Sequence, residues 1–336
     1  MASQLKPRVY LIGTGGSISF VGDYRTDYIN YSYSNRHLTI QEMLDRVPEV
    51  QQFAEVLPEQ LINVGSTEVG PPHWLQLARR INQIFDADPD AAGVAITHGT
   101  ATLEETAYFL NLAVKSHRPV VITGAMRPPT GLGTDADLNL IDCIRVAASP
   151  ESVGRGVLTI LNNEIQAARD VTKTNSYRLE TFRSNELGCL GYADSDEQVV
   201  FYRTPTRSHT LDTEFQVSEG TELPRVDIAY AYAGADGLVI RAFADAGVPG
   251  LVAAGLGSGG SPPEFMAALK DAIAAGTKVV IATHTGNGRV MRTRRFQEDG
   301  YIVADNLAPK KARILLMLAL TRTDDPSEIQ RMMLTY

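Results

Sequence analysis

Short runs of apolar and β-branched residues alternate along the chain with longer segments in which apolar residues recur every three or four positions. The short runs predict buried strands at 8–12, 61–64, 93–97, 119–123, 157–161, 226–230, 250–254 and 278–283. The longer segments predict helices at 39–46, 71–85, 102–112, 138–148, 236–246, 262–275, 309–322 and 326–334. Because strands separated by helix-length segments pair in parallel and are covered on both faces, the pattern predicts an α/β protein.

Polar, irregular sequence at 203–224 interrupts this alternation and predicts a linker between two domains. The larger N-terminal domain, 1–202, is expected to hold a parallel, doubly wound sheet. The C-terminal domain, 225–336, is expected to be a smaller α/β sandwich. A chain of 336 residues is long enough to form two such cores.

Three of the predicted helices carry capping signals at their starts. Thr39 and Thr102 are each followed three residues later by a glutamate, which predicts a capping box at both. Ser261 precedes Pro262 and Glu264, so it is predicted to be an N-cap with proline at the first helical position.

Glycine and hydroxyl residues follow each of the first four predicted strands. Since the carboxyl ends of parallel strands meet at one edge of a sheet, these residues predict a site at that edge. The residues concerned are Thr14, Ser17, Ser66, Thr67, Thr100, Gly124 and Ala125. For the first loop alone, a glycine-rich turn that only connects strand to helix is an equal alternative. His98 is interpreted as structural.

Composition narrows the class of protein. The formal net charge of −8 disfavours a nucleic-acid-binding surface, and no apolar run is long enough to span a membrane. Cys143 and Cys189 are too few for a disulfide framework or a thiolate metal site, although one bridge stays open. Because the first strand begins by Arg8, no signal peptide is expected, and the chain is predicted to be cytoplasmic.

Several familiar catalytic motifs are missing from the sequence. The stretch Gly13-Thr14-Gly15 lacks the third glycine of a dinucleotide fingerprint, because Ile18 stands there. The six histidines lie singly, which favours neither a metal site nor a Ser-His-Asp arrangement. A hydrolase built on this sequence therefore needs a hydroxyl nucleophile that is activated without histidine.

The residues at these strand ends resemble the signatures of the bacterial asparaginase/glutaminase family. The stretch 13–18 resembles the family's T-G-G-T-I, and 97–107 resembles its T-H-G-T-D-T-M-E-E-T-A; 63–66, 124–128, 169–175 and 311–313 also match. The resemblance spans nearly the whole chain. It implies a two-domain α/β enzyme without a cofactor, usually a homotetramer built from dimers. Its sites would lie between the N-terminal domain of one subunit and the C-terminal domain of its partner.

The resemblance also implies roles for individual residues. Ser17 matches the threonine that forms the acyl-enzyme, Thr100 the second threonine, and Lys173 the lysine paired with it. Three tyrosines of the polar loop after the first strand compete for the hydroxyl that assists the nucleophile: Tyr28, Tyr31 and the preferred Tyr33. Ser66 matches the residue that holds the substrate α-carboxylate, and Ala125 a backbone contact to the amide.

The departures from the family pattern concern the binding of the substrate's α-ammonium group. Ala101 replaces an aspartate that binds it, Thr67 a glutamine, Ser258 an asparagine, and Thr293 a glutamate from the partner subunit; Arg292 and Arg294 lie beside Thr293. We hypothesise a small amide, lactam or imide substrate that keeps a carboxylate but lacks a free α-ammonium, with a second anionic group facing Arg292 or Arg294. The alternatives are an ordinary L-asparaginase/glutaminase and a catalytically weak ligand-binding member.

Overall fold

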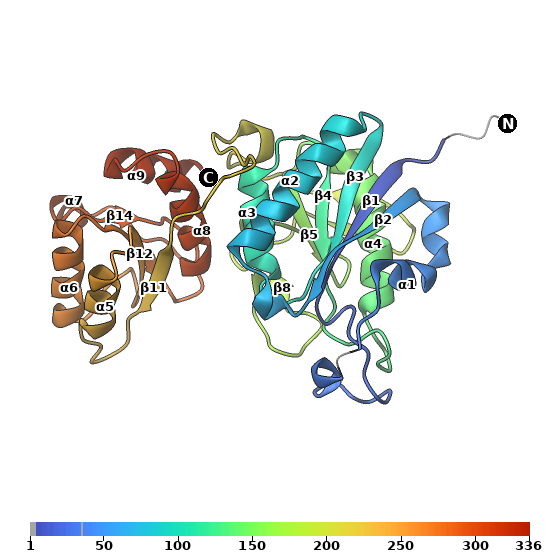
Figure 1. Ribbon diagram of the computed structural model, residues 1–336, viewed down its shortest axis with the longest axis horizontal. Helices are drawn as coiled ribbons and strands as arrows, with labels where there is room; N and C mark the ends of the chain where they lie inside the picture. The colour runs from blue at the N-terminus through green and yellow to red at the C-terminus, as the bar shows by residue number, and fades with distance from the viewer. Residues whose placement is uncertain (1–4, 35) are drawn as a thin grey trace. The chain divides into compact units, whose positions relative to one another are not determined.

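In the computed structural model, which describes residues 5–34 and 36–336, the alternating strands and helices build two large sheets in separate parts of the chain (Figure 1). One unit ends at Asp212 and the other begins at Thr213. This division falls inside the predicted linker, 203–224. The predicted α/β class with two α/β domains is confirmed.

The N-terminal unit is organised around an eight-stranded sheet in the order β10-β9-β6-β5-β4-β3-β1-β2. Five strands are parallel: β1 (Arg8–Gly15), β2 (Glu55–Val64), β3 (Ala91–Thr97), β4 (Val120–Thr123) and β5 (Val157–Leu161). Three further strands extend one edge in antiparallel fashion: β6 (Glu164–Ala167), β9 (Gly191–Ala193) and β10 (Val199–Phe201). A separate two-stranded ribbon joins β7 (Thr172–Lys173) to β8 (Phe182–Arg183).

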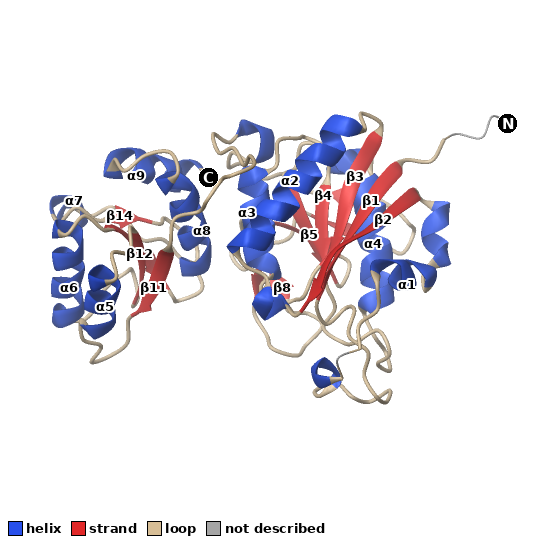
Figure 2. Cartoon of the chain, viewed as in Figure 1, coloured by secondary structure: helices blue, strands red, loops and turns tan. Residues whose placement is uncertain are grey.

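Helices cover both faces of this sheet (Figure 2). The helices α1 (Ile40–Asp45) and α4 (Ala136–Ala148) share an apolar core with alternate residues of β1 such as Val9 and Leu11. The helices α2 (Pro71–Ala87) and α3 (Leu103–Ala113) pack against each other on the other face, where the Trp74 and Phe109 rings stack. Short 3-10 helices lie at Tyr31–Tyr33, Pro48–Gln52, Ser66–Glu68, Pro150–Ser152 and Thr210–Asp212.

The C-terminal unit is a four-stranded parallel sheet between two layers of helices. Its strands are β11 (Val226–Tyr230), β12 (Gly250–Gly255), β13 (Lys278–Thr283) and β14 (Ile302–Val303), in that order. One layer holds α5 (Leu238–Asp245) and α6 (Pro263–Ala274), and the other holds α8 (Pro309–Leu320), which packs on α9 (Pro326–Thr335). The short α7 (Arg294–Glu298) follows β13. This is the predicted sandwich.

Two of the three capping predictions are wrong. Thr39 forms the expected capping box with Glu42. The Thr102 side chain makes no cap, because its hydroxyl donates instead to the Ser66 carbonyl at 2.6 Å. The helix predicted to begin after Ser261 is capped by Pro262, one residue later, and Ser261 Oγ is buried without a hydrogen-bond partner among the described residues.

The remaining general predictions concern cysteines and membrane segments. Both Cys143 and Cys189 are free thiols, so the disulfide left open by the sequence does not form. No helix within the described part of the chain is both long and apolar enough to cross a membrane.

Candidate active site

The loops after β1 and β3 touch backbone to backbone. Gly16 donates its N–H to the Val64 carbonyl at 2.9 Å and has a φ of +85°. A Cβ added at Gly16 would lie 2.0 Å from Gly99 Cα, so no residue larger than glycine fits this contact. Ser17 and Thr100 each directly follow one of these two glycines, which brings the two predicted hydroxyls to the same edge of the sheet.

The loops after β2 and β4 join the same cluster. A Cβ added at Gly99 would lie 2.5 Å from Ser66 Cβ, and one added at Gly124 would lie 2.9 Å from Thr100 Cγ2. Four consecutive parallel strands therefore bring their carboxyl ends together, as the strand-end pattern predicted. Ser17 is half-buried at this edge, whereas Ala125 is fully buried.

Lys173 and Thr100 meet although 73 residues separate them in sequence. Lys173 Nζ donates to Thr100 Oγ1 at 2.7 Å. Thr100 is only 4% exposed, so little water reaches this contact. A lysine hydrogen-bonded to a sheltered hydroxyl is an arrangement that can move a proton to and from that oxygen.

His98 lies beside this pair but is committed to other bonds. Because a carbonyl oxygen only accepts, His98 Nδ1 donates to the Gly99 carbonyl at 2.8 Å, and His98 Nε2 accepts from the Thr106 hydroxyl at 2.9 Å. Thr106 Oγ1 in turn accepts from Trp74 Nε1 at 3.0 Å. Burial lowers the pKa of His98 to about 4, so the ring is neutral at pH 7. His98 holds the Gly99 loop, which fits its structural interpretation.

The Thr14 hydroxyl is likewise occupied, because it donates to the Thr97 carbonyl at 2.7 Å and is 2% exposed. It ties β1 to β3 just before the glycine contact. Ser17, three residues further on, is partly exposed and has access to solvent.

The partly buried Asp135 and the buried Asn139, at the start of α4, hold the loop that contains Ala125. Asp135 accepts from the backbone N–H groups of Met126 and Arg127, both at 2.9 Å, and burial raises the pKa of this carboxyl. Asn139 Nδ2 donates to the Gly124 carbonyl at 3.0 Å. Neither residue was predicted from the sequence, although a position at the start of a helix beside a glycine loop is a signal for such contacts.

The three candidate tyrosines lie on a polar loop that is fastened to the segment after β4. Tyr28 donates its hydroxyl to the Leu132 carbonyl at 2.7 Å, and Leu132 N–H donates to the Arg25 carbonyl at 2.7 Å. The Tyr31 ring lies 6.3 Å from that of Phe20, and Tyr33 is 80% exposed. These contacts join none of the tyrosines to Ser17 or Thr100, so the assisting hydroxyl stays a prediction.

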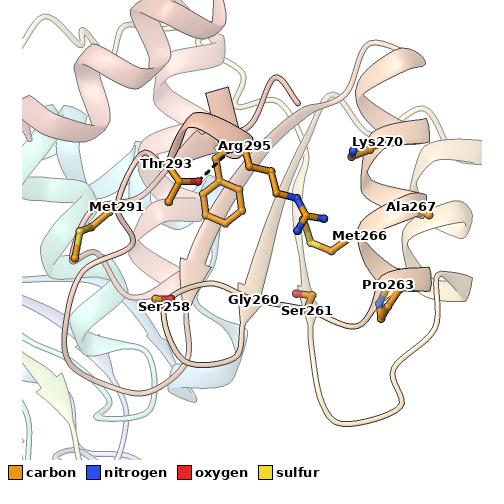
Figure 3. A pocket seen from close by; sticks show the side chains of 11 residues that line it. Ser258, Gly260, Ser261, Pro263, Met266, Ala267, Lys270, Met291, Thr293 and Arg295 are labelled. Atoms are coloured by element: carbon orange, nitrogen blue, oxygen red, sulfur yellow. Dashed lines mark hydrogen bonds between the residues drawn. The ribbon is translucent and has the colours of Figure 1, made fainter. Parts of the chain in front are cut away.

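Two of the three predicted site residues of the C-terminal unit share one cavity, and the third, the exposed Arg292, does not line it. Ser258 and Thr293 both line a space of about 620 Å³, with Met266 and Lys270 on α6 and Arg295 on α7 (Figure 3). Thr293 is also the N-cap of α7, and its Oγ1 accepts from Phe296 N–H at 3.2 Å. Its hydroxyl is therefore already engaged by the helix.

Side chains that could ligate a metal are dispersed. Over residues 5–34 and 36–336, no group of three or more His, Cys, Asp or Glu side chains is arranged to hold a metal ion.

Known protein families match both units of the chain. The family model described as "Asparaginase, N-terminal" matches residues 8–207, and the one described as "Glutaminase/Asparaginase C-terminal domain" matches residues 225–333. The chain belongs to the asparaginase family. It is therefore an amidohydrolase that acts on C–N bonds.

Individual relatives extend over nearly the whole chain. The L-asparaginase 2 of Bacillus subtilis is 42% identical over 96% of this chain and 85% of its own length. A "Probable L-asparaginase periplasmic" of Haemophilus influenzae is 40% identical over 97% of this chain and 92% of its own. The crystal structure of a probable cytoplasmic L-asparaginase from Campylobacter jejuni superposes with a TM-score of 0.93 at 38% identity, over 98% of this chain and 100% of that one.

The positions at which this asparaginase-family chain departs from the family pattern are open to solvent. Ala101 and Thr67 are exposed at the cluster of strand ends, and Ser258 and Arg292 are exposed in the C-terminal unit. Any substrate group that reaches residue 101 meets a methyl group where the family pattern has a carboxylate. The Thr100–Lys173 hydrogen bond does not involve residue 101.

Proposed function

We propose that the chain hydrolyses the carboxamide of a small carboxylate-bearing substrate in two steps, with Ser17 as the nucleophile. The observation that carries the proposal is the 2.7 Å hydrogen bond between Lys173 Nζ and Thr100 Oγ1, beside the partly exposed Ser17. A sheltered hydroxyl and amine at a strand-end cluster can supply the base that a histidine supplies elsewhere. No cofactor takes part.

In the first step Ser17 Oγ forms a bond to the amide carbon, and its proton passes to the leaving ammonia. Backbone N–H groups near Ala101 and Ala125 stabilise the negative oxygen of the tetrahedral intermediate. Water then attacks the ester carbon, and Ser17 leaves as the alcohol with one proton from that water. Thr100 and Lys173 deprotonate the nucleophile or the water, and a tyrosine of the polar loop, Tyr33 ahead of Tyr31 and Tyr28, assists Ser17.

The substrate best supported by the comparisons is L-asparagine or L-glutamine, since the relatives are named L-asparaginases and the C-terminal family model is described as glutaminase/asparaginase. Ser66, at the strand-end cluster, is proposed to hold the substrate carboxylate. On this assignment the products are ammonia and L-aspartate or L-glutamate.

Altered specificity is a second candidate, and the exposed Ala101 is the observation that favours it. A bound ammonium group without a carboxylate partner loses several kcal/mol of pairing. Substrates that keep a carboxylate but lack the free ammonium, such as succinamate, N-acetylasparagine or cyclic imides, avoid that loss. The neighbouring changes at Thr67, Ser258 and Thr293 act in the same direction.

Ammonia release from asparagine, glutamine, succinamate, N-acetylasparagine and cyclic imides separates the candidates. A kcat/KM for asparagine or glutamine that equals or exceeds the others supports the ordinary activity and removes the altered specificity. A higher kcat/KM for the substrates without an ammonium group supports altered specificity instead. Ala101→Asp should then raise asparagine turnover. Failure to hydrolyse any of them favours a ligand-binding member, and full activity in Ser17→Ala removes the proposed nucleophile.

The assembly and location follow from the family resemblance. We propose a homotetramer built from dimers, with Ser258, Arg292 and Thr293 approaching the strand-end cluster of a partner subunit. We also propose a cytoplasmic location. The Campylobacter relative, named as a probable cytoplasmic enzyme, supports it, while the Haemophilus relative is named as periplasmic.

A further inference from the structure

A fully buried carboxylate lies directly behind the Thr100–Lys173 contact. Glu104 is 0% exposed and belongs to the first turn of α3, four residues after Thr100. Its Oε1 accepts from the Lys173 backbone N–H at 3.0 Å, and its Oε2 accepts from the Thr172 hydroxyl at 2.8 Å. Burying a charge costs free energy unless it is hydrogen-bonded, and here both oxygens are.

One of the Glu104 hydrogen bonds is to the backbone of Lys173, the residue whose ammonium group donates to Thr100. Lys173 is attached at two points to the segment that leads into α3, by its backbone N–H to Glu104 and by Nζ to Thr100. The two acceptors lie four residues apart, Thr100 in the loop before α3 and Glu104 in the first turn of α3. The position of the Lys173 backbone relative to Thr100 is therefore coupled to the Glu104 side chain.

The strand that carries Lys173 depends on such an anchor. β7 has only two residues and pairs with β8 in a ribbon outside the eight-stranded sheet, with Lys173 opposite Phe182. The ladder of the main sheet, which sets the register of the strands before Ser17 and Thr100, therefore does not set the register of Lys173. Glu104 ties this ribbon to α3.

We propose that Glu104 is the positioning residue for Lys173, and the proposal rests on the function assigned above to Thr100 and Lys173. Glu104 holds the lysine backbone so that Nζ reaches Thr100 Oγ1. The Glu104 carboxylate thus acts on the lysine through the backbone of β7.

Two substitutions of Glu104 separate geometry from charge. Glutamine keeps both bonds, since its carbonyl oxygen can accept from Lys173 N–H while its NH₂ group donates to the Thr172 hydroxyl. Alanine removes both bonds. We expect kcat on the best amide substrate to fall about 100-fold in Glu104→Ala with KM within about threefold, because a misplaced catalytic group costs roughly that much. Glu104→Gln should retain kcat to within about fivefold.

Thr172→Val and Glu264→Ala complete the set. Thr172→Val removes the Oε2 bond but keeps the backbone bond to Lys173, so its kcat should lie between those of the two Glu104 variants. Glu264 is an exposed acid in the first turn of α6, and its substitution should leave kcat and KM unchanged. An unchanged kcat in Glu104→Ala, or an equal loss in Glu104→Gln, would overturn the positioning role.

A structural measurement, which does not depend on enzymatic activity, tests this inference separately from the proposed function. In a crystal structure of Glu104→Ala, or of Thr172→Val if the alanine variant does not fold, the Lys173 Nζ to Thr100 Oγ1 distance should lengthen beyond about 3.2 Å. The Glu104→Gln structure should keep it. If the unmodified chain hydrolyses no amide, the proposed function fails, yet the distance still decides the positioning role, and an unchanged distance overturns it.

Discussion

His98 makes a prediction about the pH dependence of stability. Burial lowers its pKa to about 4 in the folded chain, against 6.5 for an ordinary histidine. Between these two values the unfolded chain binds a proton that the folded chain does not, so the free energy of unfolding decreases as pH falls below about 6.5. By pH 5 the loss from this one group is about 2 kcal/mol.

Urea unfolding of the wild type and of His98→Gln at about pH 7.5 and pH 5 measures this loss. The variant cannot take up a proton at residue 98, so the stability gap between the two proteins should narrow by ~2 kcal/mol at the lower pH. A gap of the same size at both values would contradict the buried, neutral histidine.

For single residues, the sequence predicts a role when that role depends on neighbours close in sequence. His98 uses its polar atoms to hold the adjacent loop, which fits its structural interpretation, and the Thr14 hydroxyl is used in the same way to bind β3. The Thr100–Lys173 contact depends on a ribbon 73 residues further along, so only the family resemblance indicated it. Glu104 and Asn139 were missed because a buried polar side chain on a helix looks like any other polar residue until its partners are known.

At the scale of elements, the β1–β3 contact predicts a large effect of Gly16→Ala. The added Cβ would lie 2.0 Å from Gly99 Cα at a φ of +85°. Gly276→Ala is the matched control, because Gly276 has a φ of +100° but nothing within 4 Å of an added Cβ. The control should lose about 1 kcal/mol of stability from backbone strain alone.

Gly16→Ala should lose at least about 3 kcal/mol, because the loops must also separate, and it should lose most amide hydrolysis with them. Thermal unfolding and ammonia release measure the two effects. Equal behaviour of the two alanine variants would show that the glycine contact does not set the distance between the Ser17 and Thr100 loops.

The bond from α4 to the loop after β4 makes a third prediction. Asn139 is 2% exposed, donates to the Gly124 carbonyl and accepts from Asn162 N–H at 3.1 Å. Asn139→Leu leaves these backbone groups unpaired and should cost about 3 kcal/mol of stability. It should also lower kcat, because one of the two side chains that hold the loop containing Ala125 would be lost.

Asn82 provides the control for this substitution. It lies on α2, outside the loops of the proposed site, and its side chain also accepts from a backbone N–H group, that of Lys115 at 2.8 Å. Asn82→Leu should lose comparable stability and keep its kcat. If both leucine variants lose activity in proportion to stability, the α4 bond has no particular bearing on catalysis.

Sequence periodicity was sufficient for the long elements and insufficient for the short ones. Each predicted strand and helix has a counterpart, because most of the strands are buried and apolar and the helices show a 3.6-residue period. The exception is β2 (Glu55–Val64), whose polar first half lies outside the predicted strand 61–64. The strands β6, β7, β8, β9, β10 and β14 and the helix α7 were missed. They have two to five residues, too few to display a period, and tertiary pairing rather than local preference forms them.

At the scale of the whole molecule, the two units have separate cores, and the proposed site requires residues from both. The N-terminal unit holds Ser17, Thr100 and Lys173, and the C-terminal unit holds Ser258 and Thr293. The division into units was predicted from the polar stretch 203–224. Sequence periodicity does not predict how the units of different subunits pack together. That packing depends on the exposed surfaces of the units, whereas periodicity reports which residues lie in each core.

Mixing two inactive variants tests whether sites are shared between subunits. Ser17→Ala removes the nucleophile, and Ser258→Trp blocks the C-terminal contribution at an exposed position where the fold tolerates bulk. Each alone should be inactive. When both are coexpressed, a shared site is intact wherever a normal N-terminal unit meets a normal C-terminal unit, so about a quarter of wild-type activity should return in random dimers.

Light scattering on the same samples measures the molar mass of the assembly, which is expected to be four times the 36.5 kDa of one chain. As a control, the two variants are purified separately and then mixed. Stable tetramers do not exchange subunits, so this mixture should stay inactive. If coexpression restores no more than the sum of the two variants while the mass is that of a tetramer, each site is complete within one subunit.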